Sequence, residues 1–194
     1  MATQDDIITL PHDNLHQRSV RVRYVTDDIN QLISDMSEAL LDWEAHREHE
    51  VGVALAAVQI NQLKRVVIVR NDTDNKDDRR FIIFINPEIT KYEGEQTEDH
   101  EGCLSVKDIY GKVPRYEKIK VKALDIKGRE FRVTLDGFLA RTLQHEIDHT
   151  NGILFVDHIK GNPDAFFRLE ENGDLTKLDY ETEVQHDVLW EHND

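Results

Sequence analysis

The segment from Asp136 to Gly152 constrains the fold more than any other stretch, because it predicts a helix with two differently occupied faces. Asp136 is a residue type that caps helix N-termini, and Asn151-Gly152 is a typical C-terminal signal. Between these signals lies an apolar row at four-residue spacing: Leu139, Leu143 and Ile147. Such a row can anchor a helix in a core. His145 and His149 share that spacing, which places both imidazoles on one face of the helix.

Residues 145–149 read His-Glu-Ile-Asp-His, a pattern typical of metal sites in which two imidazoles bind one ion. Glu146 lies beside the histidine face, where it can reach a metal-bound water without ligating the metal. Two histidines four apart also occur by chance on ordinary amphipathic helices, so the glutamate adds most of the weight. Catalytic sites of this kind use three protein ligands and a water. A third ligand must therefore come from elsewhere in the chain.

Three sources of that ligand can be weighed. The metzincin pattern would place a third histidine at Phe155, which cannot ligate, so that class is excluded. A gluzincin-like metallopeptidase would use Glu170 or Glu171. Cys103 is the one cysteine of the chain, and a thiolate is a good ligand for Zn²⁺ or Fe²⁺. Cys103 could also be a buried free cysteine in a tight turn, the usual fate of a lone thiol. A binding or structural protein whose metal site is inert is a further alternative.

The remaining pattern predicts an α+β domain in which antiparallel or mixed β-sheets surround the central metal-binding helix. An N-terminal amphipathic helix begins at Thr26-Asp27-Asp28 and continues to Trp43, with an apolar stripe that includes Met36. A charged loop follows at residues 45–50. Five β-rich runs are expected: Val53–Ile60, Lys64–Arg70, Phe81–Ile85, Lys118–Leu124 and Glu130–Leu135. Strands before and between two helices favour α+β over a βαβ alternation.

The chain of 194 residues predicts one catalytic domain over residues 1–167 and an acidic tail of the same domain over residues 168–194. The tail carries 2 basic and 9 acidic residues, and its apolar runs around Asn172-Gly173 predict a hairpin. The whole chain has a formal net charge of −15, which excludes a broad nucleic-acid-binding face. No signal peptide, membrane-spanning run or disulfide pair is visible, so we expect a cytoplasmic protein.

Three segments together resemble the peptide deformylase family, and their order along the chain matches. Gly52–Gln59 is similar to the first family motif, Glu101–Ser105 to the second and His145–His149 to the third. Further similarity lies at Leu10-Pro11, Asp35-Met36, Asn86-Pro87 and Gln144. The resemblance extends from about residue 7 to residue 160.

The resemblance implies a role for each motif residue. The metal ligands would be Cys103, His145 and His149. Glu146 would act as general base and then as acid, while the Gln59 side-chain amide and the Leu104 N–H would hold the formyl oxygen. The family favours Fe²⁺, with Zn²⁺, Ni²⁺ or Co²⁺ as alternatives. The implied reaction removes formyl from the N-terminal formyl-methionine of nascent polypeptides, in a bacterial or virus-infected bacterial cell or an organelle.

Substrate-binding roles are implied for seven residues: Gly52, Val53, Ala54, Glu101, Phe138, Arg141 and Thr142. Ala54 stands where the family usually has glycine, beside the substrate backbone. Arg141 would be a polar wall of the methionine pocket, so we expect a weaker methionine preference. The acidic tail makes ribosome docking through a basic C-terminal helix doubtful.

Outside the motifs, Arg115 matches a family arginine near the site, although an exposed arginine fits the sequence nearly as well. Asp148 is expected to have a structural role. Stray histidines, including His46, His49 and His158, are expected to be solvated.

Overall fold

The computed structural model describes residues 2–47, 50–73, 75, 77–170, 172–185 and 188–190. The predictions for His49 and Glu171 lie outside these residues. The helices are α1 (Asp27–Ala45), α2 (Gly137–Thr150) and α3 (Phe155–Ile159). The strands are β1 (Ala54–Ala56), β2 (Val66–Arg70), β3 (Phe81–Cys103), β4 (Val106–Leu124), β5 (Glu130–Asp136), β6 (Phe166–Leu169) and β7 (Leu175–Lys177). Short helical turns occupy Gln4–Asp6, Asp13–His16, Ala57–Ile60, Pro163–Ala165, Tyr180–Val184 and Val188–Trp190.

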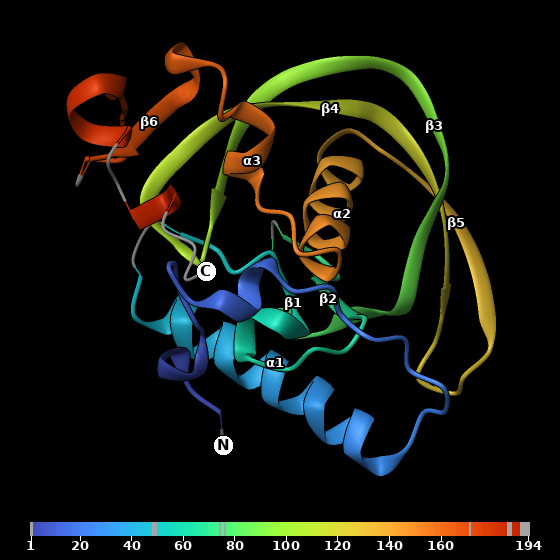
Figure 1. The fold of residues 1–194 in the computed structure, drawn as a ribbon. Coiled ribbons are helices and arrows are strands. Elements are labelled where there is room, and N and C mark those ends of the chain that lie inside the picture. The colour runs from blue at the N-terminus through green and yellow to red at the C-terminus, as the bar shows by residue number, and fades with distance from the viewer. Residues whose placement is uncertain are drawn as a thin grey trace.

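The seven strands form one antiparallel sheet in the order β1-β2-β3-β4-β6-β7, with β5 also paired to β4. The sheet is strongly curved, and β3, β4 and β5 arch around α2 (Figure 1). The α+β prediction is therefore confirmed, with one curved sheet in place of several small ones.

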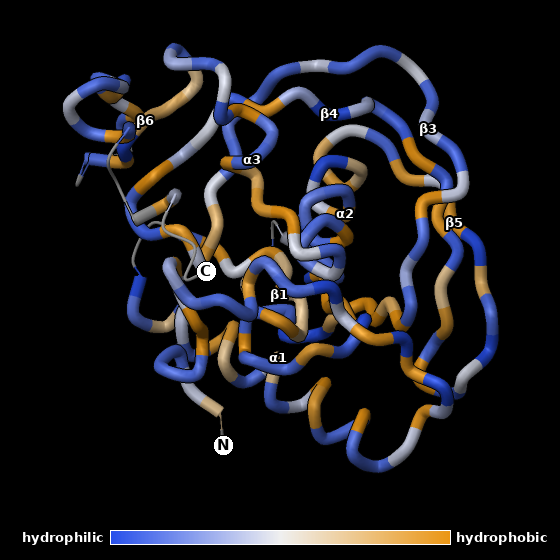
Figure 2. Tube along the Cα trace, viewed as in Figure 1, coloured by the Kyte–Doolittle hydropathy of each residue, from blue (hydrophilic) through white to orange (hydrophobic). Residues whose placement is uncertain are grey.

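Strand β2 explains how two helices are held on opposite faces of this sheet. Successive side chains of a strand point to opposite faces. Val67 and Val69 belong to the apolar cluster that contains the buried residues of α2, whereas Val66 and Ile68 belong to the cluster that contains those of α1. Because both faces are covered, every residue of β2 is buried. Figure 2 shows the hydrophobic residues gathered on these inner segments.

Strands β3 and β4 extend far beyond the predicted runs at 81–85 and 118–124. Their outer parts form a long antiparallel ribbon with Gln96 paired to Tyr116 and Gly102 paired to Tyr110. Much of β3 in this region is exposed and polar, so no alternating apolar pattern marks it. Register shifts, such as the one between Glu93 and Gln96, interrupt the period further. The ribbon delivers Cys103 to the interior at its tip.

The predicted helix boundaries hold closely, but two details differ. Thr26 and Asp136 are the N-cap residues, yet neither side chain makes a capping hydrogen bond. The C-cap of α2 is Asn151, and Gly152 follows with φ 77°. Leu139 was predicted to anchor α2, but it is 40% exposed, and the buried apolar residues of the helix include Leu143 and Ile147.

The C-terminal segment is part of the sheet. Strands β6 and β7 pair antiparallel through Arg168 and Thr176, and β6 pairs with β4 through Phe167 and Tyr110. Phe166 is fully buried in an apolar cluster with residues of α3 and of the tail. The expected boundary between residues 167 and 168 thus falls inside β6. None of the described helices is long and apolar enough to span a bilayer.

Candidate active site

The thiol of Cys103 and the imidazoles of His145 and His149 converge between the tip of β3 and helix α2. The Cys103 Sγ lies 3.2 Å from the His149 Nε2, and the two Nε2 atoms lie 3.2 Å apart. All three donor atoms lie within 4.8 Å of one another. The helix supplies two donors at one-turn spacing and the strand supplies the third. Their chemistry fits a divalent ion with a thiolate and two imidazole ligands.

Glu101 connects this donor group to two arginines. Its carboxylate lies 3.0 Å from the His145 Nδ1, accepts two hydrogen bonds from Arg115 at 3.0 and 3.1 Å, and accepts one from the Arg141 Nη1 at 2.8 Å. The residue is only 6% exposed. Burial alone would raise the pKa of Glu101, but hydrogen bonds from His145 and Arg115 lower it below the usual range. A carboxylate there orients the His145 ring and leaves its Nε2 free to ligate.

The two histidines have opposite pKa shifts. Burial lowers the pKa of His149 well below its usual value, which favours the neutral imidazole that metals bind. Burial also acts to lower the pKa of His145, but Cys103 and Glu101 outweigh it and raise the pKa. The site therefore favours a positive charge beside the His145 ring. A metal ion among the three donors would supply that charge in place of a proton.

Glu146 is buried next to the donor group, and its Oε2 has no hydrogen-bond partner among the described residues. Burial raises the pKa of Glu146 to about 7. A nearby cation acts in the opposite direction. A carboxyl group with a free oxygen beside a metal site is suited to moving a proton.

Gln59 is held so that its amide nitrogen faces the site. The Ala56 N–H donates to the Gln59 Oε1 at 2.9 Å, and the Gln59 Nε2 lies 3.6 Å from the Cys103 Sγ and 3.3 Å from the Ser105 Oγ. Leu104, half-buried in the turn after Cys103, also lines the cleft. The Gln59 amide is thus an N–H donor beside the donor atoms, the kind of group that can stabilise a developing oxyanion.

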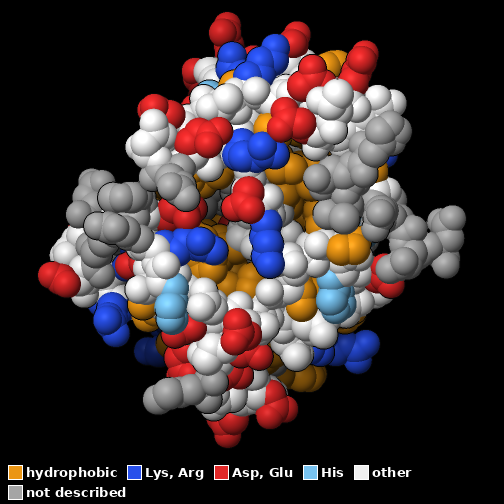
Figure 3. Space-filling view, turned by 90° about the vertical axis from the view of Figure 1, so that its left-hand side faces the viewer, with side chains coloured by type: hydrophobic (Ala, Val, Ile, Leu, Met, Phe, Trp, Pro, Cys, Tyr) orange, Lys and Arg blue, Asp and Glu red, His pale blue; other side chains and the backbone are white. Residues whose placement is uncertain are grey.

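A cleft of about 770 Å³ leads to these residues. Figure 3 shows a hollow floored by hydrophobic side chains and ringed by charged ones. Most of the predicted substrate-binding residues line the cleft: Val53, Ala54, Glu101, Phe138, Arg141 and Thr142. Gly52 is not among the lining residues. Its N–H donates to Glu44, and a Cβ there would meet Leu40 at 2.7 Å, so Gly52 is packed toward α1.

Three hydrogen bonds hold the guanidinium group of Arg141. Its Nη1 donates to Glu101 and to the Val113 carbonyl at 2.8 Å, and its Nη2 donates to the Thr97 carbonyl at 2.6 Å. The guanidinium is thus held by Glu101 and by two backbone carbonyls, while Arg141 still lines the cleft. These hydrogen bonds reduce the charge that Arg141 can present to a substrate, and the expectation of a polar wall stays a prediction.

Arg115 and His158 lie in one network behind the metal-binding face. Arg115 is buried and pairs with both Glu101 and Asp148. His158 is exposed, as expected, and its Nε2 also lies 2.7 Å from the Asp148 Oδ2. Asp148 therefore secures α2 to β4 and α3.

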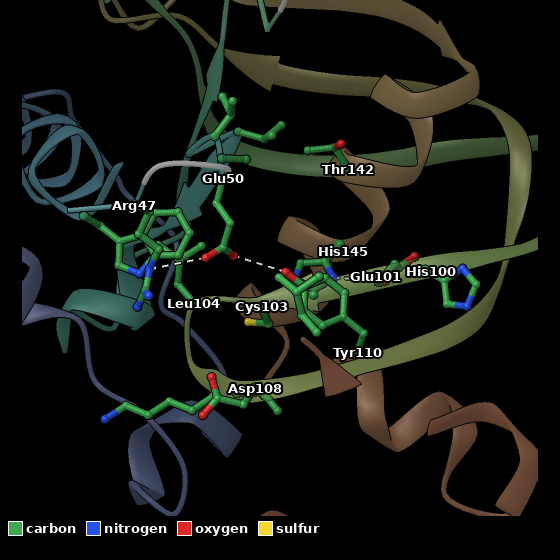
Figure 4. A pocket seen from close by; sticks show the side chains of 18 of the residues that line it. Arg47, Glu50, His100, Glu101, Cys103, Leu104, Asp108, Tyr110, Thr142 and His145 are labelled. Atoms are coloured by element: carbon green, nitrogen blue, oxygen red, sulfur yellow. Dashed lines mark hydrogen bonds and ion pairs between the residues drawn. The ribbon is translucent and has the colours of Figure 1, made fainter. Parts of the chain in front are cut away.

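A bridge at the mouth of the cleft was not predicted. The Tyr110 hydroxyl donates to Glu50 at 3.1 Å, and Glu50 pairs with Arg47 at 3.5 Å (Figure 4). Burial, followed by the charge of Glu50, raises the pKa of Tyr110 to about 12. Sixty residues separate Tyr110 from Glu50, and nothing in the local sequence links them. Only the return of β4 across the cleft brings them together.

The sequence and the structure of this chain were compared with those of known proteins. The polypeptide deformylase family model matches residues 4–164. The chain belongs to the polypeptide deformylase family. It is 44% identical to the peptide deformylase of Thermomicrobium roseum over 79% of this chain and 85% of the relative. It is 47% identical to peptide deformylase 1 of Clostridium perfringens, over 69% of this chain and 86% of the relative.

Solved deformylase structures have the same fold. The Synechococcus elongatus peptide deformylase, solved in complex with actinonin, aligns with a TM-score of 0.71 and 33% identity over 78% of each chain. The recognised family is metal-dependent, and this deformylase has a three-donor group able to bind an ion. The metallopeptidase alternative is not supported. Glu170 is exposed outside the donor group, and Glu171 lies outside the described residues.

Proposed function

We propose that this deformylase removes the formyl group from formyl-methionine at the N-terminus of nascent polypeptides, using one divalent ion bound by Cys103, His145 and His149. The convergence of these three donors within 4.8 Å, beside the buried Glu146, carries the proposal. The cytoplasm of a bacterial or virus-infected bacterial cell is the expected site of action, because formylated chains are made there.

The ligand set suits either Fe²⁺ or Zn²⁺, since both accept thiolate and imidazole ligands. We favour Fe²⁺ because of the family resemblance, with Zn²⁺, Ni²⁺ and Co²⁺ as ions that the same donors can hold. When bound, such an ion lowers the pKa of a coordinated water from 15.7 to about 7 and polarises the formyl carbonyl.

Residues of the protein transfer the proton and stabilise the developing negative charge. Glu146 accepts the proton of the attacking water and returns it to the amine as the C–N bond breaks, so that formate and a free N-terminus leave. The Gln59 Nε2 and the Leu104 N–H donate hydrogen bonds to the oxygen on which negative charge develops. Loss of one such donor typically reduces the rate by about 10²–10³.

The side chain of the substrate's first residue is proposed to lie against Phe138, Thr142 and the stem of Arg141. The peptide backbone is proposed to follow Val53 and Ala54. Ala54 is buried and belongs to the apolar cluster of α2 while also lining the cleft. We infer that the extra methyl group packs mainly against this cluster and leaves room for the substrate backbone.

The decisive experiment combines metal analysis with an anaerobic assay of formate release from a formyl-methionyl peptide. The unmodified chain should hold one ion and release formate. Cys103→Ala should lose both the ion and activity, because two imidazoles alone bind weakly. Glu146→Ala should keep the ion but lose about 10²–10⁴ in kcat. Full metal binding by Cys103→Ala would exclude the proposed ligand set, and an unchanged rate for Glu146→Ala would exclude the proposed proton transfer.

A further inference from the structure

The acidic tail contributes one wall of the substrate cleft. Leu169, Glu170 and Gly173 line the same cleft as Cys103 and His145. These three residues lie beyond position 164, where the match to the family model ends. This chain therefore completes its cleft with a segment outside the part that defines the family.

The wall is fixed in place rather than loosely attached. Strand β6 pairs with β4 at Ile109–Arg168 and Tyr110–Phe167, and the Phe167 ring packs edge-on against His100 with 4.6 Å between centroids. The turn closes through hydrogen bonds of 2.9 Å from the Glu170 N–H to the Asp174 carbonyl and from the Gly173 N–H to the Glu170 carbonyl. A preorganised wall can select among ligands without a large ordering cost.

Glu170 carries the charge of this wall. Its side chain is exposed, and none of the ion pairs among the described residues involves it. Asp108, whose strand pairs with β6, also lines the cleft and is exposed. Lys107 is the basic neighbour at this edge. The cleft-lining residues of β4 and of the tail thus carry two carboxylates and one ammonium group, a net negative charge.

Strand spacing sets which part of a substrate can reach Glu170. Gly102 pairs with Tyr110, and Tyr110 pairs with Phe167, so two strand spacings of about 4.8 Å separate the end of β3 from β6. Glu170 is three residues further along, or about 10 Å. Cys103 lies one residue beyond Gly102 in the same direction, because β3 and β6 both run antiparallel to β4. The diagonal from Cys103 is therefore roughly 12 Å, which an extended peptide covers in about three to four residues.

We propose that the tail hairpin formed by β6 and β7 is a specificity element of this deformylase, and that Glu170 favours substrates with a basic residue about four positions from the formyl group. This inference rests on the proposed function, because it concerns the same cleft and the same peptides. Acidic residues at that position would be disfavoured by like charge.

The test measures kcat/KM for formyl-Met-Ala-Ser-Xaa peptides with Lys, Gln or Glu as Xaa, together with series that move Xaa to positions three and five. The unmodified chain should prefer Lys over Glu by about two- to five-fold, the range expected for one exposed charge pair. The ratio should approach one in 0.5 M NaCl, because salt screens exposed charges. Glu170→Gln should remove the preference and Glu170→Lys should reverse it.

Glu181→Lys is the matched control, because it makes the same charge change on an exposed tail residue that does not line the cleft. It should leave the Lys-to-Glu ratio unchanged. Equal rates for all peptides, or a ratio that Glu170→Lys and Glu181→Lys alter equally, would overturn the hairpin inference while cleavage of the Gln peptide leaves the proposed function standing. Failure to cleave any of the peptides would remove both.

Discussion

Glu101 shows how one residue can link stability to chemistry. It joins a ring of the metal-binding group to two buried guanidinium groups, Arg115 and Arg141. Replacing the Glu101 carboxylate by an amide of the same shape would deprive Arg115 and Arg141 of an ion pair. It also removes the carboxylate that orients His145.

We therefore expect Glu101→Gln to lower the free energy of unfolding by about 3 kcal/mol, near the lower end for a broken buried ion pair because Arg115 keeps Asp148. Metal affinity should fall about 10- to 100-fold. Urea denaturation and competition with a chelator measure the two effects. Glu98→Gln is the control, since its 3.5 Å pair with Lys112 is exposed and should contribute less than about 0.5 kcal/mol. Equal losses in both variants would argue against the network.

The engaged guanidinium of Arg141 leads to a second prediction at this scale. Because Glu101 and two carbonyl groups hold its guanidinium group, we expect Arg141 to offer the substrate mainly its apolar stem. Burial of a methionine side chain contributes about 1.5–3 kcal/mol, or roughly 10- to 100-fold. Formyl-Met peptides should therefore be cleaved at least about ten-fold faster than formyl-Ser peptides in kcat/KM. Equal values would mean that the pocket is polar after all.

At the scale of elements, the sequence predicted the parts that have a regular apolar period. Helices α1 and α2 and strand β2 are marked by such patterns, and their bounds were close. The outer ribbon of β3 and β4 was missed because its β3 half is polar and exposed and pairs with β4 through backbone hydrogen bonds that no apolar pattern marks. Cys103 and the two histidines could be grouped from motif similarity. The Glu50–Tyr110 bridge could not, because it depends on how the ribbon curves.

The end of α2 supplies an element-scale prediction. Gly152 has φ 77°, and a Cβ there would lie 2.3 Å from the carbonyl oxygen of His16. Gly152→Ala should cost roughly 2–4 kcal/mol, from backbone strain together with the displacement of the N-terminal segment. Gly137→Ala, at the start of the same helix, has φ 54° but open space, so it should cost only about 1 kcal/mol. Urea denaturation of the two variants separates the clash from the strain, and equal costs would contradict the close approach.

At the scale of the whole molecule, the curved sheet forms the cleft and the acidic composition gives the surface a negative charge. The sheet encloses α2 so that its histidine face meets the tip of β3, and the acidic tail closes the same cleft from the other side. With a formal net charge of −15, the molecule presents a surface that repels polyanions at long range. The tail adds to this repulsion instead of offering a basic helix.

This charge predicts that the protein does not dock on ribosomes electrostatically. Binding to rRNA by Lys and Arg contacts releases counterions, so such binding is strong at low salt and falls steeply as salt rises. In co-sedimentation with purified ribosomes, we expect the chain to remain in the supernatant at both 50 and about 500 mM salt. Glu181→Lys should behave identically, because one added cation leaves the net charge strongly negative. Pelleting at low salt that disappears at high salt would show a basic docking surface that the charge distribution does not predict. Substrates would then meet this enzyme on the ribosome rather than after their N-termini diffuse into the open cleft.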